Sequence, residues 1–435
     1  MKNNKIKQII KSPFIKNVTI MSSGAAAAQL VTLILSPIIT RLYGPEAFGI
    51  MGTFTAIMNI IIPIAALTYP IAIVLPREDK DAKGLVRISV IITVFISLMT
   101  LLIILLFRSQ IISVFNLNEI SSYLLLIPLV IMFSGLMQTA EQWLIRTKQF
   151  LINAKVTFYQ SLIINGGKAG IGFIHPTATI LVFLTALGNG LRALLMIIFA
   201  RSLSKEKKEN NIIVCCKNKS LLQLAKEYYD FPIFRAPETF INAISQGLPV
   251  LMLTAFFGPA SAGFYTIGRT TLRLPGRLVG KSVGDVFYPR ISEAVNNKEN
   301  ITNIIKKATL LLGLIGIVPF GIVILFGPYL FSFVFGNDWL VAGEYARWIA
   351  LWTFVGFINR PSVRSLPVLN AQRFHLFYTV LMLIVRVIAL ALGYYLFKSD
   401  LIAVAFFGIS GAFLNAGLIV ITLKISKKKL GVVPR

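Results

Sequence analysis

The sequence has few residues that could build a metal centre or a disulfide framework. Its two cysteines, Cys215 and Cys216, are adjacent, and its only histidines are His175 and His375. Adjacent cysteines in a basic loop exclude a disulfide scaffold, and so few soft ligands predict no metal site. We therefore expect no cofactor, although an ion such as H⁺ or Na⁺ can still couple to function.

Charged residues, and acids above all, are also scarce. They make up 14% of the 435 residues, whereas a soluble protein carries about 25%. Hydrophobic residues make up 56%, and the mean hydropathy is +0.77. Lys and Arg number 43 against 17 acids, but these cations lie mainly between long apolar runs. This pattern indicates a protein embedded in a lipid bilayer, with no nucleic-acid partner.

The apolar runs predict an all-α polytopic membrane protein with about twelve spans, because crossing the hydrocarbon core takes about 20 residues. The N-terminal basic stretch and Ala25-Ala26-Ala27 resemble a signal peptide, but apolar sequence continues to Ile39, so we expect an uncleaved first span. The predicted spans are 17–40, 48–75, 85–107, 120–140, 156–174, 178–200, 234–257, 263–289, 308–328, 343–359, 374–397 and 401–423.

The distribution of cations predicts the orientation. Thirty of the 43 cations fall in alternate loops and at both termini, whereas the other loops hold only Arg41, Arg108 and Lys398. By the positive-inside rule both termini lie in the cytoplasm. The basic loop 201–233 then divides the chain into an N-terminal lobe, 1–200, and a C-terminal lobe, 234–435, which ends in a basic tail. The short outer loops leave no room for an outer catalytic domain.

An internal repeat supports two six-helix lobes. Tyr43-Gly44-Pro45 is matched by Phe257-Gly258-Pro259, and Leu75-Pro76-Arg77 by Tyr288-Pro289-Arg290, at offsets of 214 and 213 residues. Six spans separate the copies, so the lobes keep one orientation and are related by a pseudo-twofold axis along the membrane normal. The alternative is coincidence between turns, because Gly-Pro is a common turn signal.

Ten cations fall within the predicted spans and only three acids accompany them. This excess of positive charge within the membrane favours the binding of an anion. Arg269, Arg273, Arg277, Lys281 and Asp285 recur every four residues and form one inclined stripe on a helix. Three alternatives stay open for this segment: an amphipathic helix on the membrane surface, a voltage sensor, or structural cations bound to carbonyl groups. The remaining cations within spans are Arg87, Lys168, Arg192, Arg235, Arg347 and Arg386.

Polar stripes on the first and seventh spans suggest that both line a central cavity. Gln29 belongs to the first, and Glu238, Asn242 and Gln246 to the second. Ordinary hydrogen bonding between helices is the alternative. A fragment around Lys168 hints at a P-loop, but its glycine and hydroxyl positions are wrong, so no ATPase is encoded.

Four segments carry a family resemblance: ITRLYGPEAFG at 39–49, GPASAG at 258–263, FYPR at 287–290 and FGNDWLVAG at 335–343. The sequence resembles the Wzx-type oligosaccharide flippases, the polysaccharide transporter family of the multidrug/oligosaccharidyl-lipid/polysaccharide exporter superfamily. The resemblance implies two six-helix lobes around a central cationic cavity, in a bacterial inner membrane. It implies a transporter, not an enzyme, that moves undecaprenyl-pyrophosphate-linked oligosaccharide by alternating access for O-antigen, capsule or exopolysaccharide synthesis. A polysaccharide polymerase and a chain-length regulator are the expected protein partners.

With that resemblance, the stripe is assigned to pyrophosphate. Arg269, Arg273, Arg277 and Lys281 are the first candidates, and Lys168, Arg192, Arg347 and Arg386 are further ones. Gln29, Asn242 and Gln246 are candidates for sugar hydroxyls, and Glu238 and Asp285 for ion coupling. Two other functions remain: a multidrug cation antiporter, which favours acids in its cavity, and a polysaccharide polymerase or ligase.

Overall fold

The computed structural model is helical, without strands, over the residues that it describes: 13–115, 118–204, 219–297, 299–369 and 371–430. Side chains are described in these ranges except at 13–20, 22, 114–115, 118–119, 200–204, 274–286, 288–289, 292, 295–296 and 428–430. The predicted all-α class is confirmed.

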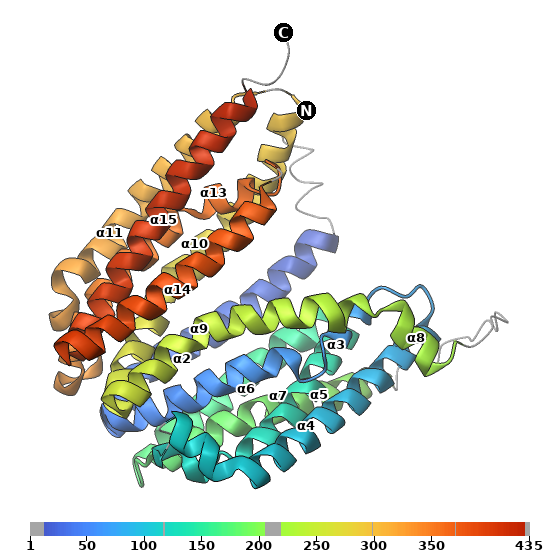
Figure 1. The fold of residues 1–435 in the computed structure, drawn as a ribbon. Coiled ribbons are helices and arrows are strands. Elements are labelled where there is room, and N and C mark those ends of the chain that lie inside the picture. Colours follow the sequence, from blue (N-terminus) through green and yellow to red (C-terminus); the bar gives the residue numbers. More distant parts are fainter. Residues whose placement is uncertain (1–12, 116–117, 205–218, 298, 370, 431–435) are drawn as a thin grey trace. The chain divides into compact units, whose positions relative to one another are not determined.

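The chain forms two compact units, Met1–Leu251 and Met252–Arg435. The first contains α2 (Pro13–Ile61), α3 (Tyr69–Ala72), α4 (Asp79–Phe115), α5 (Leu126–Arg146), α6 (Phe150–Gly172), α7 (Ala178–Ser204) and α8 (Leu221–Glu227). The second contains α10 (Pro259–Asn296), α11 (Ile301–Phe335), α12 (Leu340–Ile358), α13 (Arg360–Ser365), α14 (Gln372–Phe397) and α15 (Asp400–Leu430). The boundary falls within α9 (Ala236–Phe257). Within the first unit, α4, α5, α6 and α7 run alongside one another (Figure 1).

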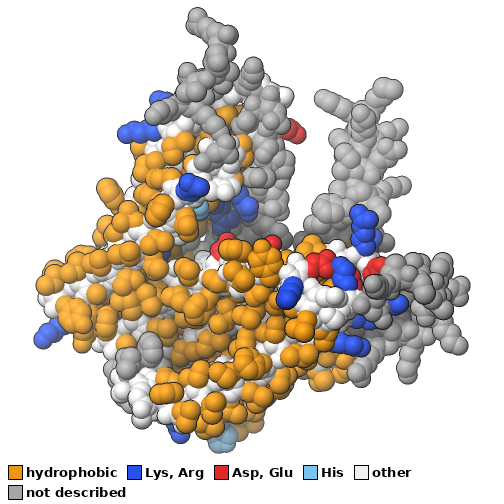
Figure 2. Space-filling model, turned by 45° about the vertical axis from the view of Figure 1, so that its right-hand side comes forward, with side chains coloured by type: hydrophobic (Ala, Val, Ile, Leu, Met, Phe, Trp, Pro, Cys, Tyr) orange, Lys and Arg blue, Asp and Glu red, His pale blue; other side chains and the backbone are white. Residues whose placement is uncertain are grey.

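Seven helical stretches of the described chain are long and apolar enough to cross a membrane. Hydrophobic side chains cover much of the face shown in Figure 2, as expected for a surface that meets lipid. The seven stretches are Ser23–Ile64, Asp79–Ser113, Ala178–Phe199, Phe231–Phe257, Ile301–Phe335, Gln372–Phe397 and Asp400–Lys427. The count of twelve crossings and the lobe boundaries at 201–233 stay predictions.

The first landmark of the internal repeat has a shared backbone geometry. Gly44 has φ 69° and interrupts α2, and Gly258 has φ 89° between α9 and α10. Only glycine adopts this region without strain, and the proline that follows each glycine suits the start of a helix. The second landmark differs, because Pro76 and Arg77 lie outside helices whereas Pro289 and Arg290 continue α10.

The prediction of one continuous span over 48–75 is wrong. α2 ends at Ile61, and a 3₁₀ turn (Ile62–Ile64) and the short α3 follow, with Leu67 and Thr68 at positive φ. Pro63 cannot donate a backbone hydrogen bond, so the helix stops there. Side-chain hydrogen bonds tie this break to neighbouring segments: Gln138 Nε2 donates to Ile62 O at 2.9 Å, and Thr68 Oγ1 donates to Phe231 O at 2.9 Å. A membrane protein tolerates such a break where neighbouring helices bury it.

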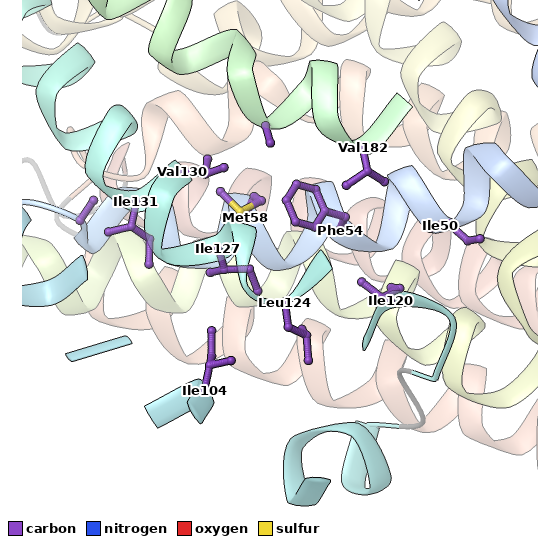
Figure 3. Packing of buried hydrophobic residues seen from close by; sticks show 12 residues of the cluster. Ile50, Phe54, Met58, Ile104, Ile120, Leu124, Ile127, Val130, Ile131 and Val182 are labelled. Carbon is purple, nitrogen blue, oxygen red and sulfur yellow. The ribbon is translucent and has the colours of Figure 1, made fainter. Parts of the chain in front are cut away.

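The core of the first unit forms around Phe54, which is fully buried on α2. Val130 from α5 and Val182 from α7 pack with it, and Met58 lies one turn further along α2 (Figure 3). The packing fixes α2 against α5 and α7 on one side and leaves the polar side chains of α6 to face an internal space.

Helices of the second unit approach closely at glycine positions. A Cβ on Gly327 of α11 would lie 2.6 Å from the Gly343 carbonyl oxygen on α12. A Cβ on Gly411 of α15 would lie 2.8 Å from the Trp352 ring on α12. Small residues let membrane helices pack backbone to backbone, since no hydrophobic effect draws them together in lipid. The close approach at Gly411 also sets the position of the Trp352 ring.

Candidate functional site

A cavity of about 320 Å³ lies inside the first unit, between α2, α5, α6 and α7. Its size falls at the lower end of the range for ligand pockets, about 300–1,000 Å³. Phe54, Met58, Val130 and Ile164 form an apolar wall. Amide and hydroxyl side chains line the rest, and they are Thr32, Thr55, Asn59, Gln160, Ser161, Asn165, Thr185 and Asn189.

A hydrogen-bond network fixes Asn165 at the side of this cavity. Its Nδ2 donates to Ser161 O at 2.9 Å and lies 3.3 Å from Thr32 Oγ1. Ser161 Oγ donates to Ala28 O at 2.8 Å, which joins α6 to α2. The Asn165 Nδ2 group is thus occupied by hydrogen bonds within the protein, whereas Asn165 Oδ1 accepts no hydrogen bond from the described residues. A carbonyl oxygen held in this way is ready to accept a bond from a hydroxyl group in the cavity.

Lys168 is the one charged side chain among the residues that line the cavity. Its Nζ lies 3.7 Å from the Met51 sulfur, a weak acceptor. Tyr43 Oη donates to Lys168 O at 2.8 Å and so holds this part of α6. Within the described part of the chain no carboxylate pairs with the ammonium group. An uncompensated ammonium among apolar helices is costly, so it favours polar or anionic contents in the cavity.

Arg192, another predicted anion ligand, has protein partners. Its Nη2 lies 3.2 Å from Glu141 Oε1 on α5 and 3.1 Å from Asn153 Oδ1 on α6. Glu141 lies just beyond the predicted span 120–140, but α5 continues to Arg146 and so brings this acid beside Arg192. The charge of Arg192 is balanced within the first unit.

Arg386 in the second unit is held by two aromatic rings. Its Cζ lies 3.9 Å from the Trp352 ring centroid and 4.0 Å from that of Phe407. Its Nε is buried and has no hydrogen-bond partner in the described structure. Arg269 of α10 lies over Tyr265, at 6.0 Å, and is near enough to Arg386 for the two positive charges to repel each other. The structure therefore brings two of the predicted pyrophosphate ligands into one neighbourhood.

The other predicted residues are spread over the structure. Arg347 donates to Leu325 O at 2.9 Å and so joins α12 to α11. Arg273 is half-buried on α10, and Gln29 is half-buried on α2. Glu238, Asn242 and Gln246 are exposed on α9, and Gln246 Nε2 lies 3.4 Å from Asn242 Oδ1. The side chains of Arg277, Lys281 and Asp285 lie outside the described residues.

The comparison with protein families decides what kind of membrane protein carries these sites. The model of the family described as polysaccharide biosynthesis protein matches residues 38–344. The chain belongs to the polysaccharide biosynthesis protein family. A search of curated proteins finds no match.

The fold of this chain is similar to the folds of solved transporters of the MOP superfamily. A structure described as lipid II flippase MurJ in an inward closed conformation matches with a TM-score of 0.67 and 15% identity, over 95% of this chain and 91% of that one. An outward-facing MATE family multidrug transporter matches with a TM-score of 0.58 and 12% identity, over 97% and 96%. A MOP superfamily transporter from Pyrococcus furiosus matches with a TM-score of 0.59 and 12% identity, over 98% and 97%. At this identity the likeness concerns the fold.

The site residues predicted from the sequence leave out most of the cavity lining. Ser161, Asn165 and Lys168 are spaced by four and then three residues, so they share one face of α6. That spacing was a usable signal. Asn59 and Asn189 carry no such pattern, because each is an isolated amide in an apolar run, and only the packing of α2 against α7 brings them to one cavity.

Proposed function

We propose that this protein is a flippase that moves undecaprenyl-pyrophosphate-linked oligosaccharide from the cytoplasmic to the outer leaflet of a bacterial inner membrane. In this proposal it works by alternating access and supplies O-antigen, capsule or exopolysaccharide synthesis. The termini face the cytoplasm, a polymerase and a chain-length regulator act next, and H⁺ or Na⁺ drives the return step. The family assignment and the similarity of the fold to transporters support this proposal.

One observation carries the proposal: the polar side chains that line the cavity of the first unit are amides, hydroxyls and one ammonium, with no carboxylate among them. Amides and hydroxyls suit sugar hydroxyl groups, which both donate and accept hydrogen bonds. An ammonium suits a phosphate or carboxylate. Arg269 and Arg386 in the second unit remain candidates for pyrophosphate, as do Arg273, Arg277 and Lys281, which follow Arg269 in the sequence of α10.

The membrane potential favours this direction of transport. An inside-negative potential stabilises an anion on the outer side by about 2.3 kcal/mol per charge per 100 mV. The free energy of an anionic pyrophosphate headgroup therefore falls as it moves outward. A multidrug cation antiporter, the second candidate, has the opposite need, since cationic drugs call for acidic side chains.

A reconstitution assay tests the proposal directly. Purified full-length protein is placed in vesicles that contain a fluorescent polyprenyl-pyrophosphate oligosaccharide in both leaflets, and a membrane-impermeant reductant is added outside. We expect the protein to make the inner-leaflet probe accessible, whereas protein-free vesicles protect it. If the protein instead exports a cationic dye and leaves the probe protected, the antiporter reading replaces ours.

A further inference from the structure

A second cavity, of about 370 Å³, lies in the second unit where α11 begins and α15 approaches its end. Five residues line it, and all are basic or neutral polar: Asn300, Thr302, Asn303, Lys306 and Lys427. The distribution of cations predicts that both chain segments face the cytoplasm. The pocket is therefore expected to lie at the level of the lipid headgroups of the cytoplasmic leaflet.

The floor of this pocket is rigid. Thr302 Oγ1 and Ser426 Oγ are 2.7 Å apart and buried, which joins α11 to α15. Ile301 and Ile305, on α11, pack in a core cluster with Phe287 of α10. The backbones that carry Lys306 and Lys427 are therefore held at a fixed separation, so the two ammonium groups flank a preformed pocket.

The charge of the pocket is not balanced by nearby acids. Neither Lys306 nor Lys427 forms an ion pair with any acid that the structure describes, and the first turn of α11 contains no acidic residue. The nearest acid in sequence, Glu299, is bound by Arg290, whose Nη1 donates to Glu299 Oε1 at 3.1 Å. This hydrogen bond holds the pKa of Glu299 below its ordinary value, so the carboxylate stays committed to Arg290.

An apolar stripe runs along α11 from the pocket. Leu310, Leu314 and Val318 follow Lys306 at four-residue steps, which places all four on one side of the helix. These three apolar side chains are 68%, 73% and 62% exposed. Phe413 and Val420 of α15 precede Lys427 at steps of seven residues and are exposed as well. Each lysine therefore ends a stripe that suits acyl chains.

We propose that this pocket binds the phosphate of an anionic phospholipid from the cytoplasmic leaflet, with the acyl chains along the exposed stripe of α11. Two ammonium groups and the Asn300 amide hold the phosphate oxygens by charge-assisted hydrogen bonds. Basic pockets between membrane helices on the cytoplasmic side are suited to such headgroups. A soluble phosphate shares the headgroup chemistry but makes no use of the stripe, which is why we assign the pocket to a lipid.

Lipid titration by native mass spectrometry tests this assignment on the purified full-length protein. The probe is phosphatidylglycerol, and the variants are Lys306→Gln/Lys427→Gln and the control Lys307→Gln/Lys424→Gln. Both variants lose two exposed lysines of the same segments, but the control lysines do not line the pocket. We expect the pocket variant to bind the first lipid about 25-fold more weakly, at roughly fivefold for each of its two cations, and the control to change less than about twofold.

Three results would overturn the assignment. Equal weakening in both variants indicates attraction by the basic surface alone. Binding of phosphatidylcholine as tight as that of phosphatidylglycerol indicates that the headgroup charge does not matter. Displacement of the lipid by millimolar inorganic phosphate indicates a site for soluble phosphate. The pocket belongs to the second unit and shares no residue with the cavity of the first unit, so none of these results bears on the flippase proposal.

Discussion

Arg192 on α7 binds Glu141 on α5 at 3.2 Å, and the same guanidinium nitrogen reaches Asn153 on α6. One side chain thereby joins three helices of the first unit. Both charges are mostly buried, with 21% and 27% of their side-chain surfaces exposed. Removal of either partner leaves a charge without compensation in an apolar setting, which costs more than the pair itself contributes.

We therefore predict that Arg192→Met lowers the stability of the protein by about 2 kcal/mol, less than for a fully buried pair. Thermal unfolding in detergent measures the effect, and Lys155→Met, an exposed lysine on α6, serves as the control. The double variant with Glu141→Gln is expected to recover part of the loss, because no unpaired acid remains. Unchanged stability together with lost transport would instead make Arg192 a substrate ligand.

Lys168 gives the sharpest test of the cavity. Lys168→Met removes the only charge among the residues that line the cavity. We expect surface polysaccharide to fall about tenfold at unchanged protein level, because one charge-assisted hydrogen bond to the substrate is lost. Lys168→Arg retains the charge and is expected to keep part of the activity. Normal polysaccharide in Lys168→Met cells, or an equal loss in Lys155→Met, would exclude a role for this cavity in transport.

Backbone conformation alone predicts the effect of an alanine at Gly44. An added Cβ meets nothing within 4 Å there, so any cost comes from φ 69° and not from a clash. We expect Gly44→Ala and Gly258→Ala to destabilise by about 1–3 kcal/mol each. Gly166→Ala and Gly170→Ala, in open space within α6, are controls that we expect to be neutral or stabilising. Similar unfolding temperatures for all four variants would contradict this account.

The aromatic contacts of Arg386 predict a preference for its planar guanidinium. Arg386→Lys keeps the charge but loses the stacking surface, so we expect a stability loss of about 1–2 kcal/mol. Trp352→Leu is expected to couple with it in a double-mutant cycle, whereas Arg373→Lys, exposed on the same helix, is expected to be silent. A cycle with no coupling energy would show that the stacking of the two groups contributes nothing.

The sequence by itself determined the class of the protein. Apolar runs of helical length, few acids and cations between the runs indicated a helical membrane protein, and the motifs from 39–49 to 335–343 indicated the family. The Gly-Pro repeat located two breaks, because a proline disfavours the α-helical conformation of the residue before it, and a glycine at that position adopts the positive φ seen at Gly44 and Gly258 without strain.

The tertiary structure decided which polar groups meet. Glu141 reached Arg192 only because α5 extends past the predicted end of its span, and Asn59 joined Asn165 only because α2 packs against α6. At the helix break after Ile61, the Ile62 carbonyl likewise finds its side-chain donor in Gln138, 76 residues away in sequence. The physical reason is common to all three: hydrophobic periodicity fixes which segments are helices and which face lipid, but the partner of a buried polar group is set by helix packing, which periodicity along one segment does not encode.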